Sequence, residues 1–504
     1  MTTNKTIAKN TLFLYFRMMF IMVTALYTSR VVLQVLGVNE FGLYTVVGGI
    51  VGMFSFLNVA LSTGSSRFLT FELGTGNFEK LKKTFSTVLN IHIAMAILIV
   101  ILAETIGLWF VYHKLPIPSD RMHAAVWVYH VSIVTAVISI TQVPYNASII
   151  SHEKINIFAY ASIVEVLAKL GVVFLLQISH RDKLILYAIL LCLIQVGMML
   201  FYRFYCISKF KETRYEFVFD KNILKSVAGF SGWSLFANFS FALNGQGMTI
   251  IIDMFFGPAV VTARAIAGQV SMAAGQFVEN FRTAVNPQIV KKYAAEDYDG
   301  SKQLLLYAAK FSFYLMFLLG LPIILLAEPL LHLWLGQVPE YTVIFLQLVI
   351  IQSLFSVFDV AFYTALYAKG RLRENALISP LMGFIQFPTV YLLFKMGYSP
   401  LTLAYAGIVT SMMLALVIKP IIICKIVNYT FRDIMSVFAP CLKVALVAVP
   451  IPVLFHYYLA NNLLNFFIIC SVSAICVLTS VFYVGMDRNM RYQVVHAVKG
   501  KLFK

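Results

Sequence analysis

The side chains with the clearest chemical potential lie between Asp253 and Glu296, in a stretch that is otherwise apolar enough to enter a membrane. If this stretch is a helix, with about 100° per residue, its charged and small polar side chains share one face: Arg264, Gly268, Ser271, Gly275, Glu279, Arg282 and Asn286. Charge inside a membrane is costly and usually faces a bundle interior or a wet cavity. A guanidinium group stays charged there and can bind phosphate through two parallel hydrogen bonds. We therefore expect Arg264 to line a cavity and to bind an anionic group. Glu279 and Arg282, three residues apart, are interpreted as an intrahelical pair that could also act as a gate.

The first apolar segment, residues 11–36, carries two arginines and no acidic residue. On a helix, Arg17 shares a face with Thr24 and Thr28, whereas Arg30 lies well away from that face. Both arginines are candidate substrate-binding residues. The alternative for each is that its side chain reaches the lipid headgroups at the nearer membrane surface.

Other polar residues inside apolar segments are candidates for coupling, gating or substrate contact. Glu165 and Lys169 are four residues apart and are interpreted first as a self-neutralising pair. Asp359 has no cation near it in sequence, so it either accepts a coupling proton or sodium ion or pairs with a neighbouring helix. Asn238 and Gln246, with Ser271, are predicted to face the substrate.

Two glycines, Gly245 and Gly247, flank Gln246. They predict a local break in the helix. Close helix packing through small residues is the alternative explanation for these glycines.

The composition indicates a membrane protein, because 60% of the 504 residues are hydrophobic and only 12% are charged, against about 25% charged residues in soluble proteins. The six cysteines form no CxxC pair, and the nine histidines show no metal-ligand spacing. We therefore predict no metal site and no cofactor. The net charge of +17 alone would suit nucleic-acid binding, but its placement indicates otherwise.

The apolar runs predict an all-α polytopic membrane protein with about 14 transmembrane helices, since about 20 apolar residues cross a bilayer. The predicted spans are 11–36, 40–64, 86–112, 123–149, 155–178, 184–206, 226–252, 258–285, 304–327, 341–367, 374–395, 400–424, 438–459 and 463–485. Lys and Arg concentrate at both termini and in alternate loops, which by the positive-inside rule places both termini in the cytoplasm. The basic excess then reflects topology and contact with anionic headgroups, not nucleic acid.

An internal repeat with an offset of about 220 residues divides these spans into two lobes. Gly37 and Gly257 each follow a span, and Phe78 and Tyr298 lie at corresponding places after the next one. Six spans in each copy predict a parallel repeat. The predicted organisation is a six-helix lobe at 1–206, a cytoplasmic linker at 207–225, a second six-helix lobe at 226–424, and two extra helices with a basic cytoplasmic tail at 425–504.

The segments VPYNASIISHEKINIFAYASIVEVLAKL (143–170) and FFGPAVVTARAIAGQVSMAAGQFVENFRTAVNPQIVKKYAAED (255–297) resemble Wzx-type oligosaccharide flippases. These belong to the multidrug/oligosaccharidyl-lipid/polysaccharide exporter (MOP, MATE-like) superfamily. The resemblance implies fourteen helices in two lobes, a bacterial inner-membrane location, and transfer of undecaprenyl-pyrophosphate-linked oligosaccharides for surface polysaccharide such as O-antigen (lipopolysaccharide), capsule or exopolysaccharide. It also implies a cationic cavity lined by arginines of the first and eighth helices, which are Arg17, Arg30 and Arg264 here.

The sequence therefore favours a flippase that works by alternating access, as a monomer whose substrate is a lipid-linked oligosaccharide and whose partners, if any, are other polysaccharide-assembly proteins. Two other functions stay open. A multidrug/cation antiporter of the same superfamily would suit the fold, although such a protein favours an acidic cavity. A membrane glycan-processing enzyme is less compatible, because the loops on the outer face are short and hold no catalytic motif.

Overall fold

The computed structural model describes the backbone of residues 2–152, 154, 156–218, 220–370, 373–460, 462–488 and 490–492. Side chains are described for these residues apart from 2–17, 60, 63, 156, 159, 222, 226–234, 237, 284, 287 and 373–376.

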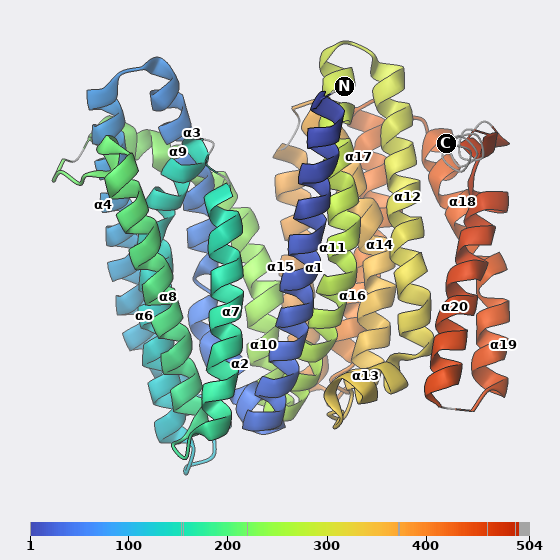
Figure 1. Cartoon of the computed structure of the whole chain (residues 1–504), viewed down its shortest axis with the longest axis horizontal. Coiled ribbons are helices and arrows are strands. Elements are labelled where there is room, and N and C mark those ends of the chain that lie inside the picture. The colour runs from blue at the N-terminus through green and yellow to red at the C-terminus, as the bar shows by residue number, and fades with distance from the viewer. Residues whose placement is uncertain are drawn as a thin grey trace. The chain divides into compact units, whose positions relative to one another are not determined.

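All secondary-structure elements in the described ranges are helical (Figure 1). In chain order the elements are α1 (Thr2–Leu36), α2 (Val38–Gly52), α3 (Ser55–Thr75), α4 (Phe78–Leu102), η1 (Ala103–Gly107), α5 (Leu108–His113), α6 (Met122–Ser151), α7 (Asn156–Ile178), α8 (Lys183–Lys209), η2 (Lys211–Thr213), α9 (Lys221–Ala242), η3 (Leu243–Gly247), α10 (Met248–Phe256), α11 (Pro258–Ala294), α12 (Tyr298–Leu325), α13 (Ala327–Leu335), α14 (Thr342–Ala368), α15 (Arg373–Lys395), α16 (Thr402–Met412), η4 (Met413–Ile418), α17 (Lys419–Ile426), α18 (Phe431–Ala448), α19 (Pro450–Tyr458), α20 (Leu463–Ser480) and η5 (Val481–Gly485). The segment η2 is a 3₁₀ turn, and the other η segments are π-helical turns within longer helices.

Within the described residues, 11 helices are long and apolar enough to cross a membrane, or 12 if the bent pair α2–α3 counts as one span. The two remaining predicted spans correspond to the helical segments α9–η3–α10 and α11. The prediction of an all-α, multi-pass membrane protein with about 14 helices is confirmed.

The second predicted span, 40–64, is a pair of helices bent at its middle. The chain breaks after Gly52, and α2 and α3 differ in direction by 50°. Three glycines in the last turns of α2, at 48, 49 and 52, weaken the helix there, because each costs about 1 kcal/mol relative to alanine. The predicted span 438–459 likewise divides into α18 and α19, since Pro450 cannot donate a helical hydrogen bond.

The predicted repeat is confirmed by the positions at which helices begin. Helices α2 and α11 begin at Val38 and Pro258, α4 and α12 at Phe78 and Tyr298, and α6 and α14 at Met122 and Thr342, each pair 220 residues apart. The glycines that precede α2 and α11 have matching backbone angles, with φ 83° and ψ 167° at Gly37 and φ 80° and ψ 177° at Gly257. A positive φ favours glycine, which explains why both copies carry one there.

The starts of α2 and α11 pack against each other in a reciprocal way. Thr262 Oγ1 donates a hydrogen bond of 2.7 Å to the carbonyl of Val38. A Cβ on Gly42 would lie 2.0 Å from the carbonyl oxygen of Pro258, so the backbones touch at that point. Val38 and Gly42 correspond to Pro258 and Thr262 through the repeat. Such a mutual contact is typical of a local two-fold relation.

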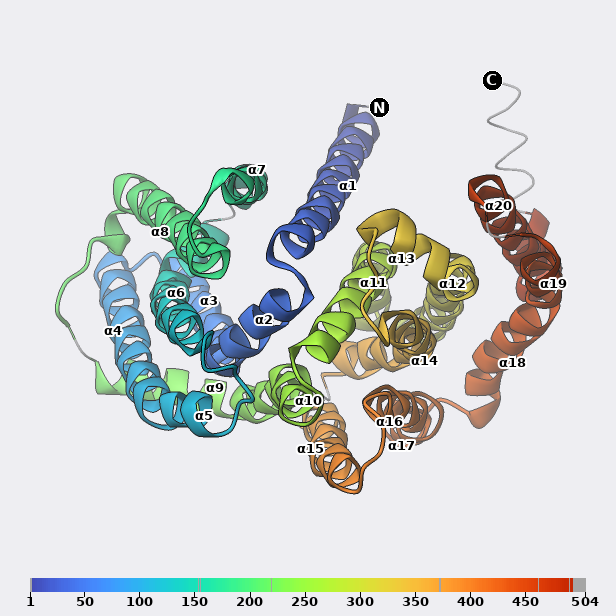
Figure 2. The same cartoon turned by 90° about the horizontal axis from the view of Figure 1, so that it is seen from below.

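The helices group into two compact units. Unit 1 comprises Met1–Thr262 and Pro380–Leu392, and unit 2 comprises Ala263–Ser379 and Leu393–Lys504. The predicted lobe boundaries near 206 and 226 remain a prediction. In unit 1, α6 packs against α3, α4 and α8 (Figure 2). Helix α9 packs on α3, and the side chain of Ser240 donates a hydrogen bond to Pro380 in α15 at 2.8 Å.

The segment between α8 and α9 binds along α4 of unit 1. The amide N–H of Glu216 donates to Ser86 Oγ at 3.2 Å, and Asn90 Nδ2 donates to the carbonyl of Val218 at 3.0 Å. The predicted linker at 207–225 is therefore tied to unit 1 by its backbone.

In unit 2, α12 packs against α14 on one side and against α18 and α20 on another. The Tyr314 hydroxyl donates a hydrogen bond to the carbonyl of Gly485 at 3.2 Å. Buried residues of α18 and α20, including Val437, Val444 and Val477, belong to the same apolar core as Phe317 in α12. The two extra C-terminal helices are thus an integral part of unit 2.

Candidate functional site

The polar face of α11 in unit 2 is directed toward α14. Ser271 Oγ lies 3.0 Å from Ser353 Oγ, and Asn286 Oδ1 accepts a hydrogen bond from Thr364 at 3.4 Å. Ser271 remains half-buried. The predicted polar stripe is therefore partly used for packing between α11 and α14, with Ser271 at the contact.

The predicted pair of Glu279 and Arg282 is present. Arg282 Nη2 donates to Glu279 Oε2 within the same helix. Arg282 is only 7% exposed, whereas Glu279 is exposed. The Nε and Nη1 atoms of Arg282 have no hydrogen-bond acceptor among the described residues. A buried N–H without an acceptor costs about 1–3 kcal/mol, so this guanidinium has unused capacity to bind an anionic group.

The three arginines predicted to bind phosphate lie in different environments. Arg264 is half-buried in α11 of unit 2, and Arg30 is half-buried in α1 of unit 1. The side chain of Arg17 lies outside the described residues. Two residues before Arg30, the Oγ1 atom of Thr28 is buried without a hydrogen-bond partner.

Asp359 forms an ion pair with a cation that is remote in sequence. Lys419 Nζ lies 2.8 Å from Asp359 Oδ1, and Lys419 is 1% exposed. The ammonium also lies 5.9 Å from the ring centroid of Tyr363. Of the two explanations for Asp359, the partner on another helix is the one present here. Lys419 directly follows the π-helical turn η4. Such turns within helices are frequent at functional sites.

The interpretation of Glu165 and Lys169 as a pair is confirmed, with 2.6 Å between Lys169 Nζ and Glu165 Oε1. Glu165 lines an apolar groove between α7 and α8 that also includes Val164 and Phe201.

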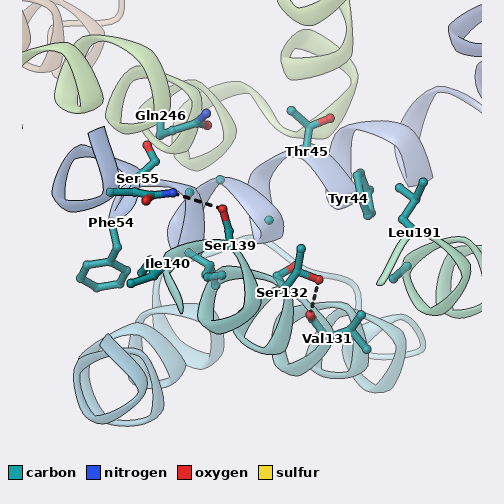
Figure 3. Close-up of a pocket in the computed structure, with 18 residues that line it drawn as sticks. Tyr44, Thr45, Phe54, Ser55, Val131, Ser132, Ser139, Ile140, Leu191 and Gln246 are labelled. Carbon is teal, nitrogen blue, oxygen red and sulfur yellow. Dashed lines mark hydrogen bonds between the residues drawn. The ribbon is translucent and has the colours of Figure 1, made fainter. Parts of the chain in front are cut away.

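A cavity of about 440 Å³ lies in unit 1 between α2, α3, α6 and α8 (Figure 3). Gln246 enters it from η3, and an added Cβ on Gly49 would lie 3.0 Å from Gln246 Oε1. The predicted break around Gln246 is not present, because the helix continues from α9 to α10 through the π-helical turn η3. Asn238, half-buried in α9, is not among the residues that line this cavity.

A second cavity of about 320 Å³ shares Asn58 and Ser139 with the first. Asn58 Nδ2 donates to Ser139 Oγ at 3.1 Å. We call the two cavities together the polar groove. Neither is lined by a charged residue within the part of the chain that the structure describes.

Most of the groove residues on α6 were not predicted from the sequence. Ser132, Ser139 and Asn146 recur every seven residues, with Thr135 and Gln142 beside them. This spacing places them on one face of a helix. The signal was present in the predicted span 123–149, but uncharged residues at this spacing do not stand out from ordinary helix packing.

An ionic cluster holds helices together at the end of unit 1 that is predicted to face outward. Arg121 donates hydrogen bonds to Glu40 at 2.6 Å and to Asp182 at 2.7 Å. These carboxylates raise the pKa of Arg121. Burial tends to raise the pKa of Asp182, but hydrogen bonds from Arg121 and from the Ile185 N–H outweigh it, so that the pKa is lowered. The cluster joins the first turns of α2, α6 and α8.

Residues 234–392 match the MatE family model, and no curated protein matches the sequence. Among solved structures, the chain is similar to the lipid II flippase MurJ in an inward closed conformation, with a TM-score of 0.72, 14% identity, and 94% of this chain and 99% of that chain covered.

It is also similar to an inward-facing multidrug resistance MATE transporter of the MOP superfamily, with a TM-score of 0.68, 16% identity, and coverage of 81% and 96%. A MOP superfamily transporter from Pyrococcus furiosus gives a TM-score of 0.53, 15% identity, and coverage of 81% and 96%. The chain therefore has the fold of MOP-superfamily transporters. The families that it matches are transporters and not enzymes.

Proposed function

We propose that this protein is a flippase that moves an undecaprenyl-pyrophosphate-linked oligosaccharide from the inner to the outer leaflet of the bacterial cytoplasmic membrane. The observation that carries this proposal is the pair of guanidinium groups on the otherwise apolar helix α11. Arg264 is half-buried, and Arg282 is buried with two nitrogen atoms that lack acceptors. A pyrophosphate supplies the acceptors that such groups require.

The coverage of the solved structures supports a lipid-linked substrate. The structure named as a lipid II flippase covers 94% of this chain, whereas the multidrug transporter covers 81%. The flippase fold therefore accounts for more of the chain. A multidrug antiporter remains the second candidate, because its TM-score of 0.68 is also high.

In the proposed mechanism, Arg264, Arg30 and Arg17 bind the pyrophosphate, and Asn238, Gln246 and Ser271 contact the sugars. Alternating access exposes these groups first to one leaflet and then to the other. Arg282 also contacts the pyrophosphate, through its two nitrogen atoms without acceptors, while its pair with Glu279 acts as a gate. The pairs Asp359–Lys419 and Glu165–Lys169 act in gating or coupling. For Asp359 to accept a coupling proton or sodium ion, Lys419 must leave it during the cycle, because the carboxylate is already neutralised.

The proposal is tested by the fate of the lipid-linked intermediate in a deletion strain, in which we expect accumulation at the inner leaflet. Complementation with Arg264→Ala should lower flipping roughly 10- to 100-fold, the value of a charged hydrogen bond, at equal expression. Arg264→Lys should recover part of the rate, since it restores charge without the bidentate geometry. Arg181→Ala, at an exposed loop arginine, is the control.

Wild-type flipping by Arg264→Ala would contradict the assignment of the phosphate site. Drug sensitivity of the deletion strain without loss of surface polysaccharide would favour the multidrug antiporter.

A further inference from the structure

The polar groove of unit 1 has a hydrogen-bonding character of its own. Its hydroxyl groups on α6 donate inward to their own helix, from Ser132 to the carbonyl of Val128 at 2.8 Å and from Thr135 to that of Val131 at 2.9 Å. Their oxygen lone pairs, and not their protons, are therefore available to a ligand.

Two amide oxygens of the groove have no hydrogen-bond partner among the described residues, namely Asn58 Oδ1 and Gln142 Oε1. Their amino groups are engaged, with Asn58 donating to Ser139 at 3.1 Å and Gln142 to Asn146 at 3.4 Å. Gln142 is only 5% exposed. Buried polar atoms are almost always hydrogen-bonded. Both oxygens are themselves buried in the wall of the groove, so a ligand that donates hydrogen bonds reaches them only after the side chains of this wall move.

Aromatic rings complete the wall of the groove. Tyr44 lines the larger cavity, and its ring centroid lies 4.9 Å from that of Tyr187 in α8. Phe54 lies at the break between α2 and α3. Such apolar surfaces suit the C–H faces of pyranose rings, while the amide oxygens suit the ring substituents.

We propose that the polar groove is the saccharide subsite and that it selects uncharged sugar residues, whose hydroxyl and acetamido N–H groups donate to Asn58 and Gln142. This inference rests on the proposed function and specifies the class of glycan. A uronic acid or other anionic sugar is disfavoured, because its carboxylate would be desolvated against acceptor oxygens, with no cation among the described residues that line the groove.

The experiment uses the purified full-length protein in vesicles and three defined lipids. One is bare undecaprenyl pyrophosphate, one carries two N-acetylglucosamine residues, and one carries N-acetylglucosamine followed by glucuronic acid. All three share the pyrophosphate, so differences in their binding report the sugar alone. We expect the uncharged glycolipid to bind about tenfold tighter than the bare lipid, and the acidic glycolipid to bind no tighter than the bare lipid.

Gln142→Leu removes the unpaired oxygen at nearly constant volume. It should abolish the tenfold advantage of the uncharged glycolipid and leave the affinity for the bare lipid unchanged. Gln142→Lys should instead raise the affinity for the acidic glycolipid. Gly48→Leu is a second variant that should abolish this advantage. A Cβ at residue 48 would lie 3.7 Å from Ser132 Oγ, so the leucine side chain fills the groove at that point.

The matched control is Gly171→Leu, because Gly171 is exposed on α7 and a Cβ there meets nothing within 4 Å. This variant should bind all three lipids as the wild type does. Equal binding of the three lipids by the wild-type protein would overturn the subsite while leaving the flippase proposal intact. Failure of the protein to bind any of the three would overturn the flippase proposal itself, and the subsite with it.

Discussion

The two repeats of this protein use corresponding backbone positions for different side chains. Where α2 and α3 of the first repeat carry Tyr44, Val59 and Ser62, α11 of the second repeat carries Arg264, Glu279 and Arg282, each 220 residues later. The same holds on the neighbouring helix, where Ser139 of α6 corresponds to Asp359 of α14. At these positions the first repeat therefore presents hydroxyl or apolar groups, and the second presents charges.

This difference suggests a division of labour within one scaffold. For the glycolipid substrate proposed above, neutral hydroxyl groups suit the sugars and guanidinium groups suit the pyrophosphate. Duplication supplies equivalent backbone positions, and substitution at these positions makes their chemistry different.

The comparison is tested most strongly at Asp359, because its ion pair has no counterpart in the first repeat. Asp359→Ser copies Ser139 and leaves Lys419, 1% exposed, without its carboxylate partner. We expect a loss of about 3–5 kcal/mol in the free energy of unfolding, measured by chemical denaturation in detergent. The double variant Asp359→Ser/Lys419→Met, which copies Ser139 and Met199, should recover most of the loss.

The control is Ser139→Ala, which removes only the hydrogen bond from Asn58 and should cost about 1 kcal/mol. If Asp359→Ser destabilised the protein no more than this control, the ion pair would contribute no more to stability than a neutral hydrogen bond. The charged and neutral repeats would then not differ in stability at this position.

A second prediction concerns the crossing of the two repeats at Gly42. A Cβ there meets the backbone of Pro258 at 2.0 Å, so Gly42→Ala should cost about 1–3 kcal/mol of stability by overpacking. Gly268→Ala, in α11 with nothing within 4 Å, should stabilise by up to about 1 kcal/mol through helix propensity. Thermal unfolding of both variants measures the difference. An unaltered Tm for Gly42→Ala would show that the crossing is loose.

The third and smallest predicted effect concerns the residues that cap equivalent helices in the two repeats. Asn77 accepts from the Lys80 N–H at the start of α4, and Asp297 accepts from the Gly300 N–H at the start of α12. Hydrogen bonds from Lys292 and from the Gly300 N–H lower the pKa of Asp297. Since its folded-state pKa lies below the ordinary value of about 4, the stabilisation is complete above that value and is lost as the pH falls through the lowered pKa.

Hydrogen–deuterium exchange in the first turn of α12 should therefore speed up at pH 3 relative to pH 7, after correction for intrinsic rates. Asp297→Asn copies the cap of the first repeat and should remove this pH dependence while keeping the turn protected. Equal pH dependence in the wild type and in Asp297→Asn would contradict the assignment to this carboxylate.

Much of the fold could be predicted from the sequence, because the relevant signals are local. Apolar length determines the spans, and glycines with positive φ, such as Gly37 and Gly257, recur at the repeat offset. The pairs Glu279–Arg282 and Glu165–Lys169 were predictable for the same reason, since their spacing on one helix determines their contact.

The features that were not predicted depend on contacts between distant segments. Lys419 approaches Asp359 only because α17 packs on α14, and no sequence spacing encodes that. The break between α2 and α3 leaves both halves apolar, so hydropathy alone merges them into one span. The polar groove is formed by uncharged residues of separate helices, which single-helix periodicity cannot combine.

The assignment of residues 380–392 to unit 1 has a consequence for biosynthesis. Ser240 of α9 donates to Pro380 of α15, and Gly383 lies so close that an added Cβ would be 2.4 Å from Ser240 Oγ. The partner of this hydroxyl emerges from the ribosome only after 140 further residues, which at about 5–20 residues per second takes roughly 7 to 28 seconds. The first unit therefore enters the membrane before the contact between α9 and α15 can form, and this contact is completed only when α15 is synthesised. During that interval α9 is exposed to chaperones and to quality-control proteases. Substitutions at the contact between α9 and α15 should therefore lower the yield of folded protein before they affect transport.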